Sequence, residues 1–183
     1  MDAIKNLINR RSSNNLQPPF PSKKEMDLVY KSALRAPDHA WLRPSKFLEF
    51  KGESLKKLSS IFENYAKNHF SNDQLFIEKA KKAPFRAPMV IVLVTEIKQH
   101  PKVPPIEQML STGAAAQNIL LALSAQGYAG IWKTGKLALN DNIAKYFDLD
   151  INHQILGYIY VGTQSGDGRK VPKVNIEKFV KRY

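Results

Sequence analysis

The stretch RAPDHAWLRPSKF, from Arg35 to Phe47, places basic, acidic and imidazole side chains around two prolines. Arg35, His39 and Arg43 could together bind an anion, because guanidinium and imidazolium groups donate charge-assisted hydrogen bonds to phosphate or carboxylate oxygens. Asp38, directly before His39, could instead take part in proton transfer with it. The stretch by itself also fits an ordinary charged turn, so its function depends on the rest of the chain.

Two further stretches carry basic and hydroxyl side chains directly after predicted elements, the first after a helix and the second after a strand. Guanidinium groups can bind phosphate through two parallel hydrogen bonds, and hydroxyls add neutral donors. Each stretch also has a plain structural interpretation, since an arginine at a helix C-terminus complements the helix dipole. The residues concerned are Arg10, Arg11, Ser12, Trp132, Lys133 and Thr134.

The composition predicts one folded domain over residues 1–183, because this length and an apolar fraction of 43% suit a sizeable core. The absence of cysteine excludes disulfides and thiolate chemistry, and it fits a reducing cytoplasm, where we expect the protein. No apolar run is long enough to span a membrane, so we expect no membrane partner. The first residues also lack the apolar core of a signal peptide.

The net charge of +12 favours anionic partners. Nucleic acid and phosphate-bearing cofactors both satisfy that preference. The basic residues are spread along the chain, and we find no RNP sequence, zinc-finger spacing or clear recognition helix. We therefore expect no nucleic-acid partner, although a basic nucleic-acid-binding domain remains an alternative.

Common catalytic and metal-binding motifs are absent from the sequence. The histidines are far apart and show no HExxH spacing, which predicts no metal site. There is no GxSxG nucleophile elbow, no Walker A motif and no GxGxxG. The residues therefore give no candidate for a catalytic nucleophile.

Hydrophobic periodicity predicts helices over 2–9, 22–35, 54–65, 73–82 and 106–126, and a brief one over 140–146. It predicts strands over 46–51, 88–96, 128–132 and 154–162, with a weaker signal near 174–176. Ser22 and Glu25 have the spacing of a capping box. Apolar residues cover most of the later circumference of the helix over 106–126, which predicts that it is buried. These elements indicate an α+β or α/β sandwich with helices on a central sheet.

Five stretches occur in order along the chain: INRRSS, LRAPDH at 34–39, KAPFRAP at 82–88, KVPPIEQMLSTGAA at 102–115, and AQGYAGIWKTG at 125–135. Together they resemble the flavin-dependent nitroreductase family, in particular its small YdjA-type members, over nearly the whole chain to about residue 162. The resemblance implies an α+β fold with a central mixed or antiparallel sheet flanked by helices. It also implies an intertwined homodimer that binds FMN at the subunit interface.

By this resemblance, residues of three motifs bind the flavin. The RRS motif would bind the phosphate and ribityl end, two residues of RAPDH would also bind FMN, and the GIWKT segment would line the flavin. The end of the long helix, 121–126, would lie near the nicotinamide nucleotide. The implied cofactor-binding residues are Arg10, Arg11, Ser12, Arg35, His39, Ile131, Trp132, Lys133 and Thr134.

The implied activity is transfer of hydride from NADH or NADPH through FMN to a nitroaromatic, a quinone or another small-molecule acceptor, with ping-pong kinetics. Because a flavin carries the chemistry itself, no side chain is assigned as catalytic, and Asp38 is expected to orient its loop.

The sequence departs from the family pattern in the loop after His39. Where many members read QPW, this chain has Arg43, Pro44 and Ser45. The loss of a bulky aromatic there would either open the pocket or move a stacking role to Trp41. This departure keeps a non-catalytic flavin-binding protein as an alternative. Larger members use basic C-terminal residues for the phosphate, for which Arg169 and Lys170 are available here.

Overall fold

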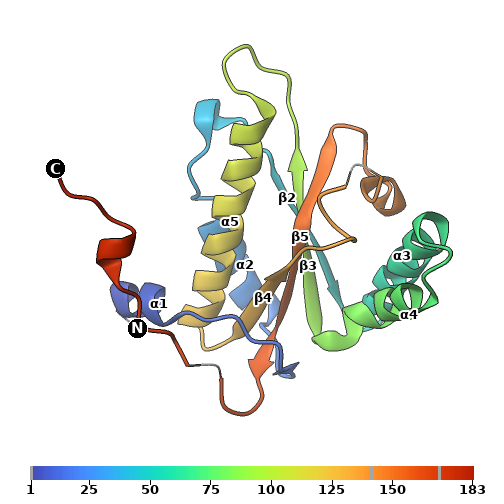
Figure 1. The fold of residues 1–183 in the computed structure, drawn as a ribbon, viewed down its shortest axis with the longest axis horizontal. Helices are drawn as coiled ribbons and strands as arrows, with labels where there is room; N and C mark the ends of the chain where they lie inside the picture. The colour runs from blue at the N-terminus through green and yellow to red at the C-terminus, as the bar shows by residue number, and fades with distance from the viewer. Residues whose placement is uncertain (1, 141, 169) are drawn as a thin grey trace.

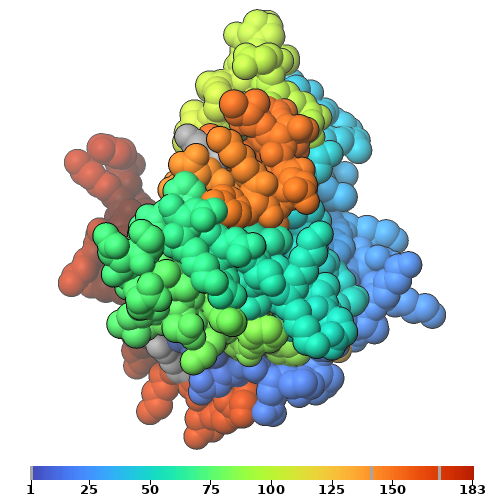
Figure 2. Space-filling model, turned by 90° about the vertical axis from the view of Figure 1, so that its right-hand side faces the viewer, coloured from blue at the N-terminus to red at the C-terminus, as the bar shows by residue number. Residues whose placement is uncertain are grey.

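The computed structural model describes residues 2–140, 142–168 and 170–183, and Figure 1 shows a sheet between two groups of helices. The helices α2 (Lys23–Ala33) and α5 (Pro105–Ala125) pack on one face, with α1 (Ala3–Asn9) against the end of α5. The other face is covered by α3 (Ser54–His69) and α4 (Gln74–Lys82), as Figure 2 shows. Short 3₁₀ helices complete the list: η1 (His39–Trp41), η2 (Ala83–Arg86), η3 (Ala144–Phe147) and η4 (Ile176–Lys178).

The five strands are β1 (Leu16–Gln17), β2 (Ser45–Lys51), β3 (Met89–Glu96), β4 (Ala129–Lys133) and β5 (His153–Gln164). Their order is β1-β5-β3-β2, and β4 pairs with β5 on the side away from β3. Every pairing between these strands is antiparallel, which confirms the predicted α+β fold and decides between a mixed and an antiparallel sheet. As a result, β4 and β1 form one edge of the sheet and β2 forms the other.

The central strand β3 separates two hydrophobic cores. Successive side chains of a strand point to opposite faces, so an apolar run such as MVIVLV requires cover on both sides. Val90, Val92 and Val94 pack with α3 and α4, whereas Met89, Ile91 and Leu93 pack with α2 and α5. The prediction that this strand is covered on both faces is confirmed.

Side chains cap the starts of α1 and α2, and the second of these caps was predicted. Asp2 caps α1 by accepting from the Lys5 amide, and Ser22 and Glu25 form the predicted capping box at the start of α2. Two expectations were wrong. Instead of a helix over 140–146, the chain has a turn at Asn140 and the later 3₁₀ helix η3. The signal near 174–176 gives no strand, because the tail runs clear of the sheet and forms the short helix η4 before its end (Figure 1).

The helix α5 is not buried on all sides within one chain. Its side chains facing the sheet are buried, but Ile106 and Leu110 are 55% and 65% exposed. Ala114, Gln117 and Leu121 continue this outward stripe at helical spacing. The predicted complete burial of this helix is therefore wrong for a single chain, since one largely apolar stripe stays open.

Candidate functional site

A pocket of about 590 Å³ lies between α1, the end of α5 and the start of β4, and we call it the basic pocket. Its cationic lining residues are Lys5, Arg10 and Arg11, and amide side chains come from Asn6, Asn9 and Gln164. None of the described residues that line it is an aspartate or a glutamate. A pocket with three cations and no lining carboxylate attracts an anion.

Arg10 has a buried guanidinium nitrogen that lacks a partner. Its Nη1 is out of contact with solvent and forms no hydrogen bond to any described residue, and the same is true of Asn6 Oδ1. Asn6 is held in place because its Nδ2 donates to the carbonyl of Leu121 over 2.9 Å. Buried polar groups are almost always hydrogen-bonded, and because this Nη1 is closed off from solvent, an anion in the basic pocket would reach it only after the Arg10 side chain turns.

The segment after α1 is attached to the outer edge of β4. Ser12 pairs with Gly130 in a parallel bridge, and the Ser13 amide donates to the Gly130 carbonyl over 3.3 Å. Alternate residues of a strand direct their backbone groups to the same side, so the N–H and C=O of Trp132 also point outward. None of the described residues pairs with them. This open strand edge can hydrogen-bond the rim of a flat heterocycle.

The side chains of the GIWKT segment alternate between the two faces of the sheet. Trp132 packs toward α5, and its Nε1 donates to the carbonyl of Leu156 over 3.2 Å. Ile131 packs on the opposite core beside α3, and Thr134 is exposed. Ile131 and Trp132 therefore offer a ligand mainly their backbone.

Lys133 lies on the α3 side of the sheet in a positively charged environment. Its Nζ donates to Asn14 Oδ1 over 3.1 Å and lies 5.7 Å from the centre of the Tyr160 ring. Burial lowers the pKa of Lys133, and the positive charge of Arg86 lowers this pKa further. No described carboxylate offsets these two effects, so the ammonium group lacks a compensating anion among the described residues.

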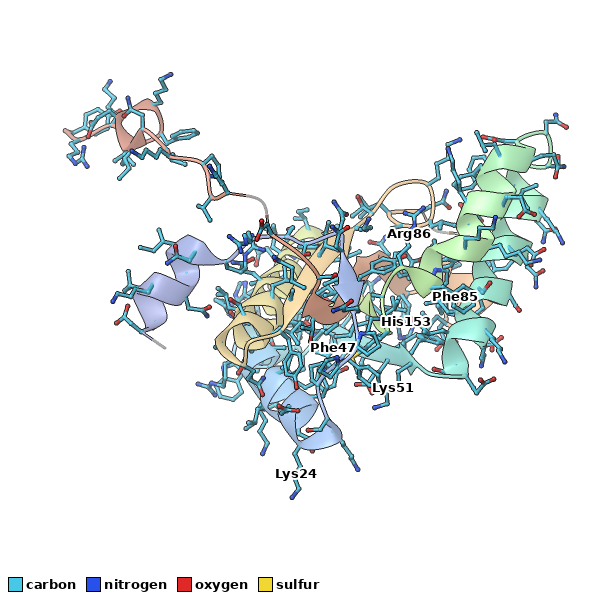
Figure 3. The ribbon with its side chains drawn as sticks, turned by 90° about the horizontal axis from the view of Figure 1, so that it is seen from below. Lys24, Phe47, Lys51, Phe85, Arg86 and His153 are labelled. Carbon is cyan, nitrogen blue, oxygen red and sulfur yellow. The ribbon has the colours of Figure 1, made fainter. Side chains whose placement is uncertain are left out.

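Arg86 was not among the predicted site residues, although it belongs to the quoted KAPFRAP stretch. It ends η2, where Figure 3 labels it, and its positive charge acts on Lys133 at the end of β4. Its position in the KAPFRAP stretch, between two prolines, could have indicated it as a site residue. Arg86 extends the positive charge beside Lys133.

Arg35 lies in a second hollow of about 330 Å³ at the end of α2, which we call the loop pocket. His39 is on the same loop, and its Nδ1 lies 2.6 Å from Glu107 Oε2. Asp38 accepts a hydrogen bond from the Arg43 amide over 2.7 Å. This bond gives Asp38 the orienting role that the sequence suggested. The lining of the loop pocket consists of residues 33–38, 41, 43–45 and 111.

The two pockets lie at opposite ends of α5. His39 contacts Glu107 at its beginning, and Asn6 contacts Leu121 near its end. A helix rises 1.5 Å per residue, so these contacts are about 21 Å apart along the axis. Figure 1 shows η1 and α1 at the two ends of α5. One chain therefore brings the RRS motif to the GIWKT segment but leaves Arg35 and His39 apart from both.

Two further sequence signals have a limited place in the structure. The end of α5 contributes Ser124 to the basic pocket. In the tail, Lys170 is exposed, and Arg169 lies outside the described residues.

Within the described ranges, no group of acidic, histidine or cysteine side chains could hold a metal ion. None of the described helices is both long and apolar enough to cross a membrane.

The fold and the pockets define an α+β protein with a cationic pocket next to an open strand edge. Comparison with known families gives the class a name. The family model of the nitroreductase family matches residues 7–163, and this chain belongs to that family.

One curated relative and two solved structures illustrate the similarity. YdjA of Escherichia coli (strain K12), named as a candidate NAD(P)H nitroreductase, is 37% identical over 163 residues, which cover 89% of this chain and 88% of YdjA. A nitroreductase-like family protein from Bacillus cereus has a TM-score of 0.83 at 19% identity, covering 100% of this chain and 96% of its own. A nitroreductase with bound FMN from Bacteroides fragilis NCTC 9343 has a TM-score of 0.78 at 17% identity, with 100% of both chains covered.

Proposed function

We propose that residues 1–183 form a single domain that acts as an FMN-dependent NAD(P)H oxidoreductase of nitroreductase type. The observation that carries this proposal is the basic pocket, which Lys5, Arg10 and Arg11 line without any described carboxylate, beside the open edge of β4. A phosphate group would satisfy the first feature and a flat heterocycle the second. The name of YdjA and the FMN in the Bacteroides fragilis nitroreductase support the same cofactors.

The residues around the basic pocket divide the binding of FMN among them. Arg10 and Arg11 donate charge-assisted hydrogen bonds to the phosphate, and the Ser12 hydroxyl adds a neutral donor. The backbone of Trp132 pairs with the ring rim. Lys133 supplies positive charge near the ring, which favours the extra negative charge of reduction. When bound, FMN accepts a hydride and passes it on.

We infer that the site is completed by a second copy of the chain. His39 contacts Glu107, and Arg35 lines the loop pocket with Ser111, so neither joins the basic pocket of its own chain, which Leu120 and Ser124 line. The open stripe of α5 and the exposed Ile4, Leu7 and Ile8 of α1 supply apolar surface for a homodimer. In that dimer Arg35 and His39 bind the cofactor held by the partner's basic pocket.

The proposed turnover follows a ping-pong course at one site. NADH or NADPH delivers a hydride, and the solvent supplies one proton. A small acceptor, such as a quinone or a nitroaromatic, takes up both and gains two electrons. The alternative is a chain that binds the flavin without turnover. A cytoplasmic location, which the lack of cysteine fits, stays a prediction.

The test is the visible absorbance of the purified protein after addition of FMN and removal of the excess, followed by NADH or NADPH under argon. Retained yellow colour that bleaches with a nicotinamide is the expected result. Colour that is retained but does not bleach would contradict the activity and leave the non-catalytic binder. No retained colour would contradict the cofactor.

A further inference from the structure

The loop pocket combines an aromatic surface with positive charge. Trp41 is 76% exposed, and the guanidinium carbon of Arg43 lies 5.8 Å from the centre of its ring. Arg35 lines the same hollow, together with the hydroxyl-bearing Ser45 and Ser111. An arginine stacked on an aromatic ring keeps its planar N–H groups free for an oxyanion.

Only one carboxylate lines the loop pocket among the described residues, and it is already engaged. Asp38 accepts from the Arg43 amide over 2.7 Å, so its role is to shape the loop. The salt bridges between described residues include neither Arg35 nor Arg43. Two guanidinium groups therefore face the hollow without an acidic partner.

The loop is held in a conformation that ordinary residues avoid. Ala40, Trp41 and Arg43 have φ values of 57°, 54° and 50°. Left-handed backbone is unfavourable for residues with a Cβ, and such strain is concentrated at binding and catalytic sites. Here it presents the Trp41 ring and the Arg43 side chain on one short loop.

We propose that the loop pocket binds the acceptor, and that it prefers a planar aromatic compound carrying a carboxylate. Trp41 stacks against the ring of the acceptor, and Arg43 binds the carboxylate, while Arg35 at the inner side of the loop pocket holds the partner's cofactor. The volume of about 330 Å³ suits a compound with one aromatic ring. This preference rests on the proposed oxidoreductase function. In this loop a charged residue, Arg43, would recognise the acceptor in place of the aromatic that the QPW motif supplies.

The test compares two acceptors that differ only in charge, 4-nitrobenzoate and 4-nitrobenzamide, using the FMN-loaded protein. Arg43→Gln is expected to raise KM for the benzoate about tenfold more than KM for the benzamide, since it removes a hydrogen bond to a charged group. The control is Lys46→Gln, which removes a nearby positive charge that pairs with Glu96 outside the pocket. It is expected to leave the ratio of the two KM values unchanged.

Equal effects of Arg43→Gln on both acceptors would overturn the proposal, as would an equal change of the ratio in Lys46→Gln. Calorimetric titration of the protein with benzoate and with benzamide separates this proposal from the proposed function. Benzoate binding that Arg43→Gln weakens would support the pocket even if NADH and NADPH are not oxidised. Turnover of both acceptors without any preference for benzoate would refute the pocket and keep the oxidoreductase.

Discussion

Trp132 and Lys133 are neighbours in β4, yet their side chains lie on opposite faces of the sheet. The Trp132 indole donates to Leu156 in the core beside α5, and the Lys133 ammonium lies over the Tyr160 ring on the α3 side. The strand edge between them carries the open N–H and C=O of Trp132. The proposed flavin site therefore lies along the edge of β4, where the backbone of Trp132 and the side chain of Lys133 can contact the ligand. The Trp132 side chain serves mainly to pack the core.

Lys133→Ala should weaken FMN binding about tenfold, since a hydrogen bond or close contact to a charged group contributes about 1.5 kcal/mol or more. Fluorescence titration of apoprotein with FMN measures this. The control is Lys136→Ala, whose ammonium group pairs with Asp73 and is exposed. An unchanged affinity in Lys133→Ala would remove this lysine from the site.

Arg10→Ala should have opposite effects on binding and on folding. FMN affinity should fall by about 1.5–3 kcal/mol, because charge-assisted phosphate contacts are lost. The free energy of unfolding of the apoprotein should stay the same or rise, because the variant no longer buries an unpaired guanidinium nitrogen. Urea unfolding and FMN titration of one sample give both quantities. A large loss of apoprotein stability, with FMN affinity intact, would show that Arg10 is structural.

Gly157→Ala should destabilise the fold by about 1–3 kcal/mol. A Cβ on Gly157 would overlap Trp132 Nε1 and lie 2.7 Å from the carbonyl oxygen of Lys133, and the residue has φ of +138°. Thermal unfolding measures the loss. Gly52→Ala is the control, because it also has positive φ but no atom within 4 Å of the added Cβ. Equal losses in both variants would attribute the effect to backbone conformation alone.

Leu110→Asp should convert the proposed homodimer to monomers and abolish flavin retention, because it places a charge in the open stripe of α5. Leu75→Asp is the matched control. Leu75 is 66% exposed on α4, against 65% for Leu110 on α5, and it lies on the opposite side of the sheet. Light scattering after size exclusion gives the oligomeric state. A dimer that persists in Leu110→Asp would place the interface elsewhere.

Local chemistry made much of the fold predictable. The apolar run of β3 required cover on both faces, and the Ser22 capping box defined the start of α2. Features that depend on a neighbour were not predictable in the same way. The outer stripe of α5 reads as core in the sequence, but in one chain it faces outward. The tail near 174–176 has strand-like residues, but no adjacent strand pairs with it within the described chain.

The candidate site was predictable as a set of motifs but not as a geometry. Motif order alone could not show that Trp132 points toward α5, since the face to which a strand residue points depends on the register of its strand in the sheet. Nor could it show that His39 and Arg10 lie near opposite ends of α5. That separation follows from the lengths and packing of α1, α2 and α5 together.

The most direct test of the shared site is flavin content in a heterodimer of Arg10→Ala and Arg35→Ala chains, co-expressed with different tags and purified through both. If Arg10 and the partner's Arg35 serve one FMN, one site of this heterodimer carries both changes and the other is intact. The heterodimer should then retain about half of the wild-type FMN and bleach with NADH or NADPH. Flavin content as low as that of either variant homodimer would contradict a site built from two chains.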